Sequence, residues 1–107
     1  MASTPEPIEV AIGVTATDLY TAFTGGASRA WLVSLDLTNT TTSDITVDVY
    51  KEVSGPTDYR FGDDLIVPAK GTLSWRGMLT LKTAGDKIKA IASATGVDCV
   101  GTVVENA

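Results

Sequence analysis

Apolar and polar residues alternate with a period of two along most of the chain, which is the pattern of β-strands with one buried face. The clearest run covers residues 31–39. Four large apolar side chains share one face of this run: Trp31, Val33, Leu35 and Leu37. We predict that this face belongs to the core and that the intervening side chains face solvent.

A second alternating run follows a polar segment at residues 39–44. Ile45, Val47 and Val49 share one face of it, and their neighbours are mostly polar. The two runs and the polar turn between them predict a β-hairpin. Pro56 is expected to end this strand, because proline cannot donate to a strand ladder.

Four further strand signals occupy the second half of the chain. A less regular stretch leads into residues 65–67, and Pro68 then forces a turn. Alternation resumes between Leu73 and Leu81, with a bulge or bend expected at Gly77. A face of small residues comes next: Ile88, Ala90, Ala92 and Ala94. A last strand is predicted at residues 97–104.

The first 27 residues divide into an N-terminal segment, two stretches of strand character and a glycine turn. Residues 8–14 and 17–23 have strand character, although a helix over residues 16–23 stays open as the alternative. Gly25 and Gly26 are interpreted as turn residues. In residues 1–7, Pro5 and Pro7 deny the backbone two ladder hydrogen bonds. We therefore expect residues 1–7 to form an extended arm ahead of a single domain at residues 8–107.

Together these elements predict an all-β fold of about seven or eight strands. Each sheet has one apolar face to bury, so we expect a sandwich of two antiparallel sheets, of immunoglobulin-like or jelly-roll type. The 107 residues are enough for one hydrophobic core and do not require a second.

Composition narrows the classes of partner. The formal net charge of −5 gives no electrostatic drive towards a phosphate backbone, so nucleic acid is not expected as a partner. No apolar stretch reaches the ~20 residues of a membrane-spanning helix, and residues 1–7 do not resemble a signal peptide. We expect no membrane partner. The single cysteine, Cys99, fits a reducing compartment.

Residues that could carry chemistry are few. The chain has no histidine, which excludes histidine-dependent catalysis and histidine metal sites. Cys99 alternates with apolar strand positions, and we interpret it as a buried structural thiol. Asp58, Asp63 and Asp64 are weighed as calcium ligands or as an acid and base. Because adjacent strand residues point to opposite faces, an exposed acidic turn is favoured for them.

The aromatic residues and one sequence motif allow two interpretations. Trp31 and Trp75 are in register with aliphatic positions, so core packing is favoured over stacking on a sugar or a base. The motif that begins at Asn39 matches the acceptor pattern for glycosylation. Without a secretory signal we give this match no functional meaning.

The order of features resembles small β-sandwich proteins encoded among the virion genes of tailed bacteriophages. Four stretches over residues 17–105 carry the resemblance: Leu19 with Tyr20, then AWLVSLDLTNTTTSDITVDVY, then LIVPAKGTLSW, and finally LKTAGDKIKAIASA with VDCVGTVVEN. The proline and glycine turn usual in that group is absent at residues 23–27. The resemblance implies a virion component of the head or tail, made in the bacterial cytoplasm and functional as an oligomer. It carries over no catalytic residue.

The sequence therefore predicts a structural protein that is not an enzyme, with no catalytic, cofactor-binding or metal-binding residue. Capsid or tail subunits and further copies of the chain are the expected partners, and the virion is the expected location. The alternative is a carbohydrate-binding or receptor-binding sandwich, with an exposed platform drawn from four aromatic residues: Trp31, Trp75, Tyr50 and Tyr59. An enzyme would need the three aspartates to converge with a metal ion.

Overall fold

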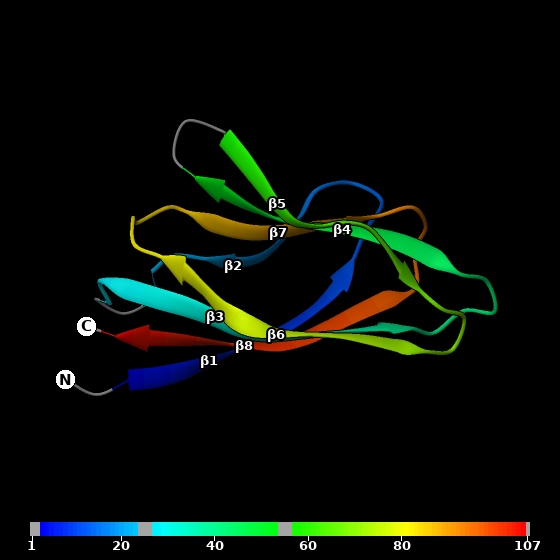
Figure 1. Ribbon diagram of the computed structural model, residues 1–107, viewed down its shortest axis with the longest axis horizontal. Coiled ribbons are helices and arrows are strands. Elements are labelled where there is room, and N and C mark those ends of the chain that lie inside the picture. The colour runs from blue at the N-terminus through cyan, green and yellow to red at the C-terminus, as the bar shows by residue number, and fades with distance from the viewer. Residues whose placement is uncertain (1–2, 24–26, 54–56, 107) are drawn as a thin grey trace.

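The alternating segments form eight strands arranged as two antiparallel sheets that pack face to face (Figure 1). The computed structural model describes residues 3–23, 27–53 and 57–106, and within these ranges it contains no helix. The strands are β1 (Ser3–Ile12), β2 (Thr17–Thr21), β3 (Arg29–Asn39), β4 (Ile45–Val53), β5 (Thr57–Val67), β6 (Thr72–Leu81), β7 (Lys87–Ala92) and β8 (Val97–Asn106). The predicted fold class is confirmed, and residues 17–21 are strand rather than helix.

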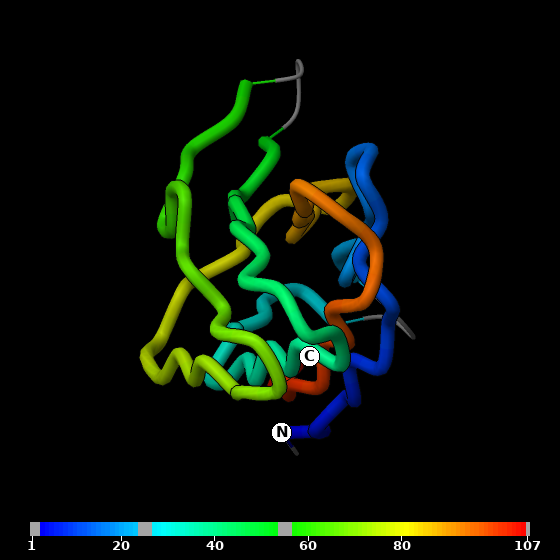
Figure 2. Tube along the Cα trace, turned by 90° about the vertical axis from the view of Figure 1, so that its right-hand side faces the viewer, coloured from blue at the N-terminus to red at the C-terminus, as the bar shows by residue number. Residues whose placement is uncertain are grey.

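The strands pair as if one long hairpin had been rolled up. β1 pairs with β8, β2 with β7, β3 with β6, and β4 with β5. One sheet has the order β1-β8-β3-β6 and the other β2-β7-β4-β5. This nested order is that of an eight-stranded jelly roll, which decides between the two sandwich types expected. Figure 2 shows the β4–β5 pair extending beyond the rest of the roll.

The polar turn at residues 40–44 crosses between the sheets, so the expected hairpin of β3 with β4 is wrong. Asn39 is fully buried and holds this crossing. Its Nδ2 donates to the carbonyl oxygens of Ser43 (2.7 Å) and Val67 (3.0 Å), and its Oδ1 accepts from the Thr41 amide (2.9 Å). Alternation cannot separate a hairpin from a crossing, because both need a polar turn between two strands.

A bulge in β3 changes which of its side chains face the core. The pairing register with both neighbouring strands shifts between Leu32 and Ser34. Leu35 is fully buried as predicted, whereas the core position before the bulge is taken by Leu32 and not by Trp31. Trp31 and Val33 are only half-buried. One extra residue inverts the inward face of a strand, and period-two counting across the bulge therefore fails.

Residues 3–7 belong to β1 and do not form a separate arm. The strand pairs with β8 along its whole length, from Ser3 opposite Asn106 to Ile12 opposite Val97. β1 is an edge strand with β8 as its only neighbour. Proline is tolerated at such an edge, since its missing N–H can face away from the partner. Residues 1–2 lie outside the described range, as do the expected turns at residues 25–26 and 54–56.

The core lies between the central strands of the two sheets. Ile45, Val47 and Val49 of β4 are buried as predicted, and so are the small side chains of β7 at Ala90 and Ala92. Ala94 is exposed in the turn after β7 and is not part of the inward face. The register shift opposite Gly77 confirms the irregularity expected in β6.

The two long margins of the sandwich differ. At the β1–β2 margin, Ile8, Ile12 and Leu19 are buried between the sheets. At the β5–β6 margin, Val67 and Leu81 are buried, but the other apolar side chains that contact the core are only partly covered. These partly covered side chains are Phe61, Leu65, Leu73, Trp75 and Leu79. We call this set the open margin.

Candidate functional site

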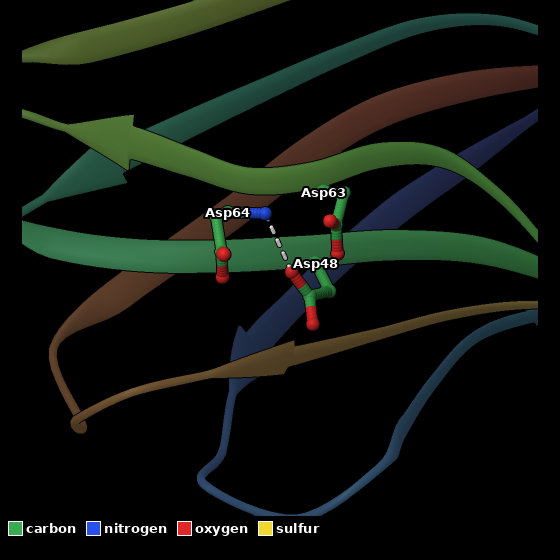
Figure 3. A group of neighbouring side chains, drawn as sticks. All are labelled: Asp48, Asp63 and Asp64. Atoms are coloured by element: carbon green, nitrogen blue, oxygen red, sulfur yellow. Dashed lines mark hydrogen bonds between the residues drawn. The ribbon is translucent and has the colours of Figure 1, made fainter.

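Three aspartates from two strands converge on the outer side of β4 and β5 (Figure 3). Carboxylate oxygens of Asp48, Asp63 and Asp64 lie within 4.8 Å of one another. Asp48 comes from the middle of β4, and the other two come from β5. Asp58 pairs with Glu52 nearer the start of β5 and is not part of the group.

A bulge in β5 brings the two adjacent aspartates to one side. The β4–β5 register shifts between Val47 and Val49, where β5 has an extra residue. Asp64 has a φ of 49°, and its amide donates to Asp48 Oδ1 at 2.7 Å. The expectation that Asp63 and Asp64 point to opposite faces is therefore wrong, because it assumed a regular strand.

The electrostatics of the cluster are those of an ion-pair network. Arg60 Nε lies 3.4 Å from Asp63 Oδ1 and 3.7 Å from Asp48 Oδ2. Its charge offsets part of the repulsion between the carboxylates. Carboxylate oxygens are also the donors that hard divalent cations take. Arg60 already contacts two of the three groups, so ion pairing alone accounts for the arrangement.

The two tryptophans have different surroundings. Trp75 contacts the core and packs against Phe61, with ring centroids 5.3 Å apart and planes at 59°. Core packing is therefore confirmed for Trp75. Trp31 lies on the outer face of its sheet, opposite Thr80 and Val104, and core packing is wrong for it. It lines a surface hollow together with Ser28, Arg29, Thr80 and Lys82.

The tyrosines weighed for a glycan platform do not sit together on an exposed surface. Tyr50 is only 6% exposed, and the Arg60 guanidinium stands 5.4 Å from its ring centroid. Tyr59 is 60% exposed and lies opposite Lys51 near the start of β5. Among the residues that the structure describes, the one close aromatic pair is Phe61 with Trp75. This distribution favours protein contacts over a continuous aromatic platform.

Cys99 lies in the core near the start of β8, buried as predicted, and is 1% exposed. Burial raises the pKa of its thiol from 9.0 to about 12, and the negative charge of Asp36 adds to the shift. A protonated, buried thiol is a poor nucleophile. Because the folded protein keeps this thiol neutral, its free energy of unfolding depends on pH.

Alkaline pH should destabilise the fold through Cys99. The folded thiol keeps its proton from pH 9.0 to about 12, whereas the unfolded thiol loses it, so rising pH favours unfolding in that window. Between about pH 8 and pH 10 we expect the wild type to lose roughly 1 kcal/mol more stability than Cys99→Ala. Urea unfolding at each pH measures the difference. Parallel pH profiles for the two proteins would show that the thiol is not linked to folding.

One buried polar link was missed by the sequence pattern. The Tyr20 hydroxyl of β2 donates to Glu105 Oε2 of β8, joining the two sheets inside the sandwich. Burial and this hydrogen bond both raise the pKa of Tyr20. The signal was present in the sequence, because Glu105 continues the inward alternation of Cys99 and Val103. A carboxylate at a core position requires a polar partner.

Comparisons with known proteins give no family assignment for the chain. The chain matches no protein-family model and no curated protein. Within the described residues, no helix has the length and apolar character needed to cross a bilayer.

Proposed function

We propose that this chain is a structural subunit of a bacteriophage virion, which decorates or stabilises the capsid or forms part of the tail and has no enzymatic activity. The sequence resemblance to virion β-sandwiches supports the proposal. The jelly roll also supports it, because this fold recurs in viral capsid proteins. It recurs in lectins too, so the fold is an analogy and the argument for function rests on the surface.

The open margin is the observation that carries the proposal. It places five partly covered apolar side chains between two strands that are both sheet edges. Edge strands present unpaired backbone donors and acceptors to which another chain can add. Met78, on the same edge strand, is 74% exposed and adds an apolar side chain to this edge of the sheet. Such a surface is typical of a contact with another protein.

The opposite margin, formed by β1 and β2, is less suited to contact another chain. The β1 edge carries Pro5 and Pro7, whose missing N–H groups discourage strand addition. Side chains of Ile8 and Ile12 are fully covered there, and Val10 between them is partly covered. The contrast points to the open margin as the contact surface, and we propose a second copy of this chain as its occupant. The homo-oligomer would then be the unit that joins the particle.

Replacing Met78 by lysine should abolish self-association without affecting the fold. We expect wild-type protein to sediment as an oligomer and Met78→Lys as a monomer, because a charge at the contact loses its water on assembly. Surface substitutions of this kind usually change stability by less than about 0.5 kcal/mol. Thermal melting of the monomeric variant should therefore show an intact domain.

Val14→Lys is the matched control, because Val14 is also exposed (53%) but precedes β2 at the opposite margin. It should sediment like the wild type. A monomeric wild type at high protein concentration would contradict the proposed self-association. Oligomers that persist in Met78→Lys would place the contact elsewhere on the molecule.

A further inference from the structure

The hollow beside Trp31 combines an aromatic side chain, two cations and two hydroxyl groups. β3 contributes Arg29 and Trp31, and Thr80 at the end of β6 lies directly opposite Trp31. Ser28 precedes β3, and Lys82 follows β6. The hollow has a volume of about 690 Å³, against about 230 Å³ for the one beside Asp48. It is therefore large enough for a ligand of more than one ring.

The bulge in β3 creates this arrangement. Without the extra residue between Leu32 and Ser34, Trp31 would share the inward face of Leu35. With it, Trp31 stands outside and half-buried, in a row with Val104 and Thr80. Keeping a large indole out of the core and next to charged residues has no evident benefit for packing.

Arg29 and Lys82 line the same hollow at the end of the β3–β6 ladder. The last pair of that ladder is Ala30 with Leu81, and the two cations are the next residues in β3 and after β6. Both are exposed, and neither has an ion-pair partner among the residues that the structure describes. Like charges that line one hollow repel each other. An anion bound between them would remove this repulsion.

The other cations of the chain are already engaged. Four of them form ion pairs: Arg60, Arg76, Lys87 and Lys89. The Nζ atoms of Lys51 and Lys70 each donate to a backbone oxygen at 2.8 Å. In a chain of net charge −5, the two cations left over stand together at this hollow. Asp86 lines the adjoining hollow with Lys82, but no ion pair joins the two.

The chemistry of the hollow selects an anionic ligand that carries both a ring and hydroxyl groups. An arginine fork matches a carboxylate in shape, and a lysine adds a second charge-assisted bond. The indole offers a flat apolar surface to the C–H face of a sugar ring. Ser28 and Thr80 can exchange hydrogen bonds with sugar hydroxyls. A polyphosphate chain fits poorly, since only two cations are available against the net negative charge.

We propose that this hollow binds an acidic saccharide, with Arg29 and Lys82 on the carboxylate and Trp31 under the sugar ring. The site goes beyond the role in particle assembly. It lies on the outer face of the β1-β8-β3-β6 sheet, at Trp31, whereas the residues of the open margin contact the core. Binding in the hollow and contact through the open margin therefore use different side chains.

Trigalacturonic acid and its methyl ester provide a matched pair of probes, with the same sugar rings and different charge. Titration calorimetry and amide NMR shifts should detect binding of the acid, with shifts centred on Arg29, Trp31 and Thr80. We expect the ester to bind at least about tenfold more weakly, since charge-assisted bonds are roughly twice as strong as neutral ones. Equal binding of acid and ester would overturn the role of the two cations.

Variants locate the site. Arg29→Gln and Trp31→Ala should each weaken binding of the acid about tenfold or more, while Lys70→Gln, a cation at a distant turn, should leave it unchanged. Melting curves establish that each variant is folded. An acidic tetrapeptide of glutamate is the competing probe. Stronger binding of the peptide than of the saccharide, or no binding of either, would overturn the proposal.

Discussion

Replacing Gly101 by alanine should destabilise the fold by about 3 kcal/mol or more, because overpacking against rigid backbone cannot relax locally. Gly101 lies in the middle of β8, between Ile8 of β1 and Leu35 of β3. A Cβ at this position would collide with the backbone oxygen of Ser34 and lie 3.0 Å from Leu35 Cδ2. Relief of the clash would require two central strands to separate.

Gly13→Ala is the matched control for this experiment. An added Cβ at Gly13 meets its nearest atom, Thr17 Oγ1, at an ordinary 3.4 Å. Its effect should stay within about 1 kcal/mol of the wild type. Chemical denaturation of the three proteins measures the difference. If Gly101→Ala were as stable as Gly13→Ala, the close approach of β3 and β8 would be wrong.

Val47→Asp should lower the free energy of unfolding by about 3 to 5 kcal/mol or more, because it buries an unpaired charge. Val47 is fully buried in β4, where it lies opposite Leu65 of β5 and Ala92 of β7. No cation is available at this core position to pair with a carboxylate. Leu35→Ala tests the facing sheet and should cost about 2 to 5 kcal/mol through the cavity it leaves.

Val14→Asp introduces the same charge at an exposed site and should leave the melting temperature nearly unchanged. Circular dichroism during heating distinguishes the variants. A Val47→Asp protein with the melting temperature of the wild type would mean that β4 does not turn this face to the core. If Leu35→Ala were as stable as the wild type, the second half of β3 would not turn Leu35 to the core.

The regular strands could be predicted from the sequence because their inward positions alternate without interruption. In β4 and β8, period two leads directly from Ile45 to Val49 and from Val97 to Val103, all of them buried. Period-two counting fails in β3. Nothing in the order of its apolar residues marks the bulge near Val33, since both faces of Trp31–Leu37 carry a large apolar residue. The bulge is fixed by pairing with β6 and β8, which lie far away in the sequence.

The candidate sites depend on the same long-range pairing. Asp63 and Asp64 were recognisable, but Asp48 joins them only through the β4–β5 register. The hollow at Trp31 required the β3–β6 pairing, which brings Arg29 and Lys82 to the same hollow at the end of the ladder. Strand order cannot be predicted from local patterns either. A polar turn such as the one after Asn39 can connect the two strands of a hairpin or two strands in different sheets.

Electron microscopy of purified phage particles tests the central proposal most directly. Particles assembled with this chain should show repeated sandwich-shaped density on the head or tail, at sites where copies of the chain contact each other. Particles from a deletion of its coding sequence should lack that density and be less stable or less complete. The role as a virion subunit is contradicted if infectious particles, purified from a phage that encodes the chain, contain no copies of it.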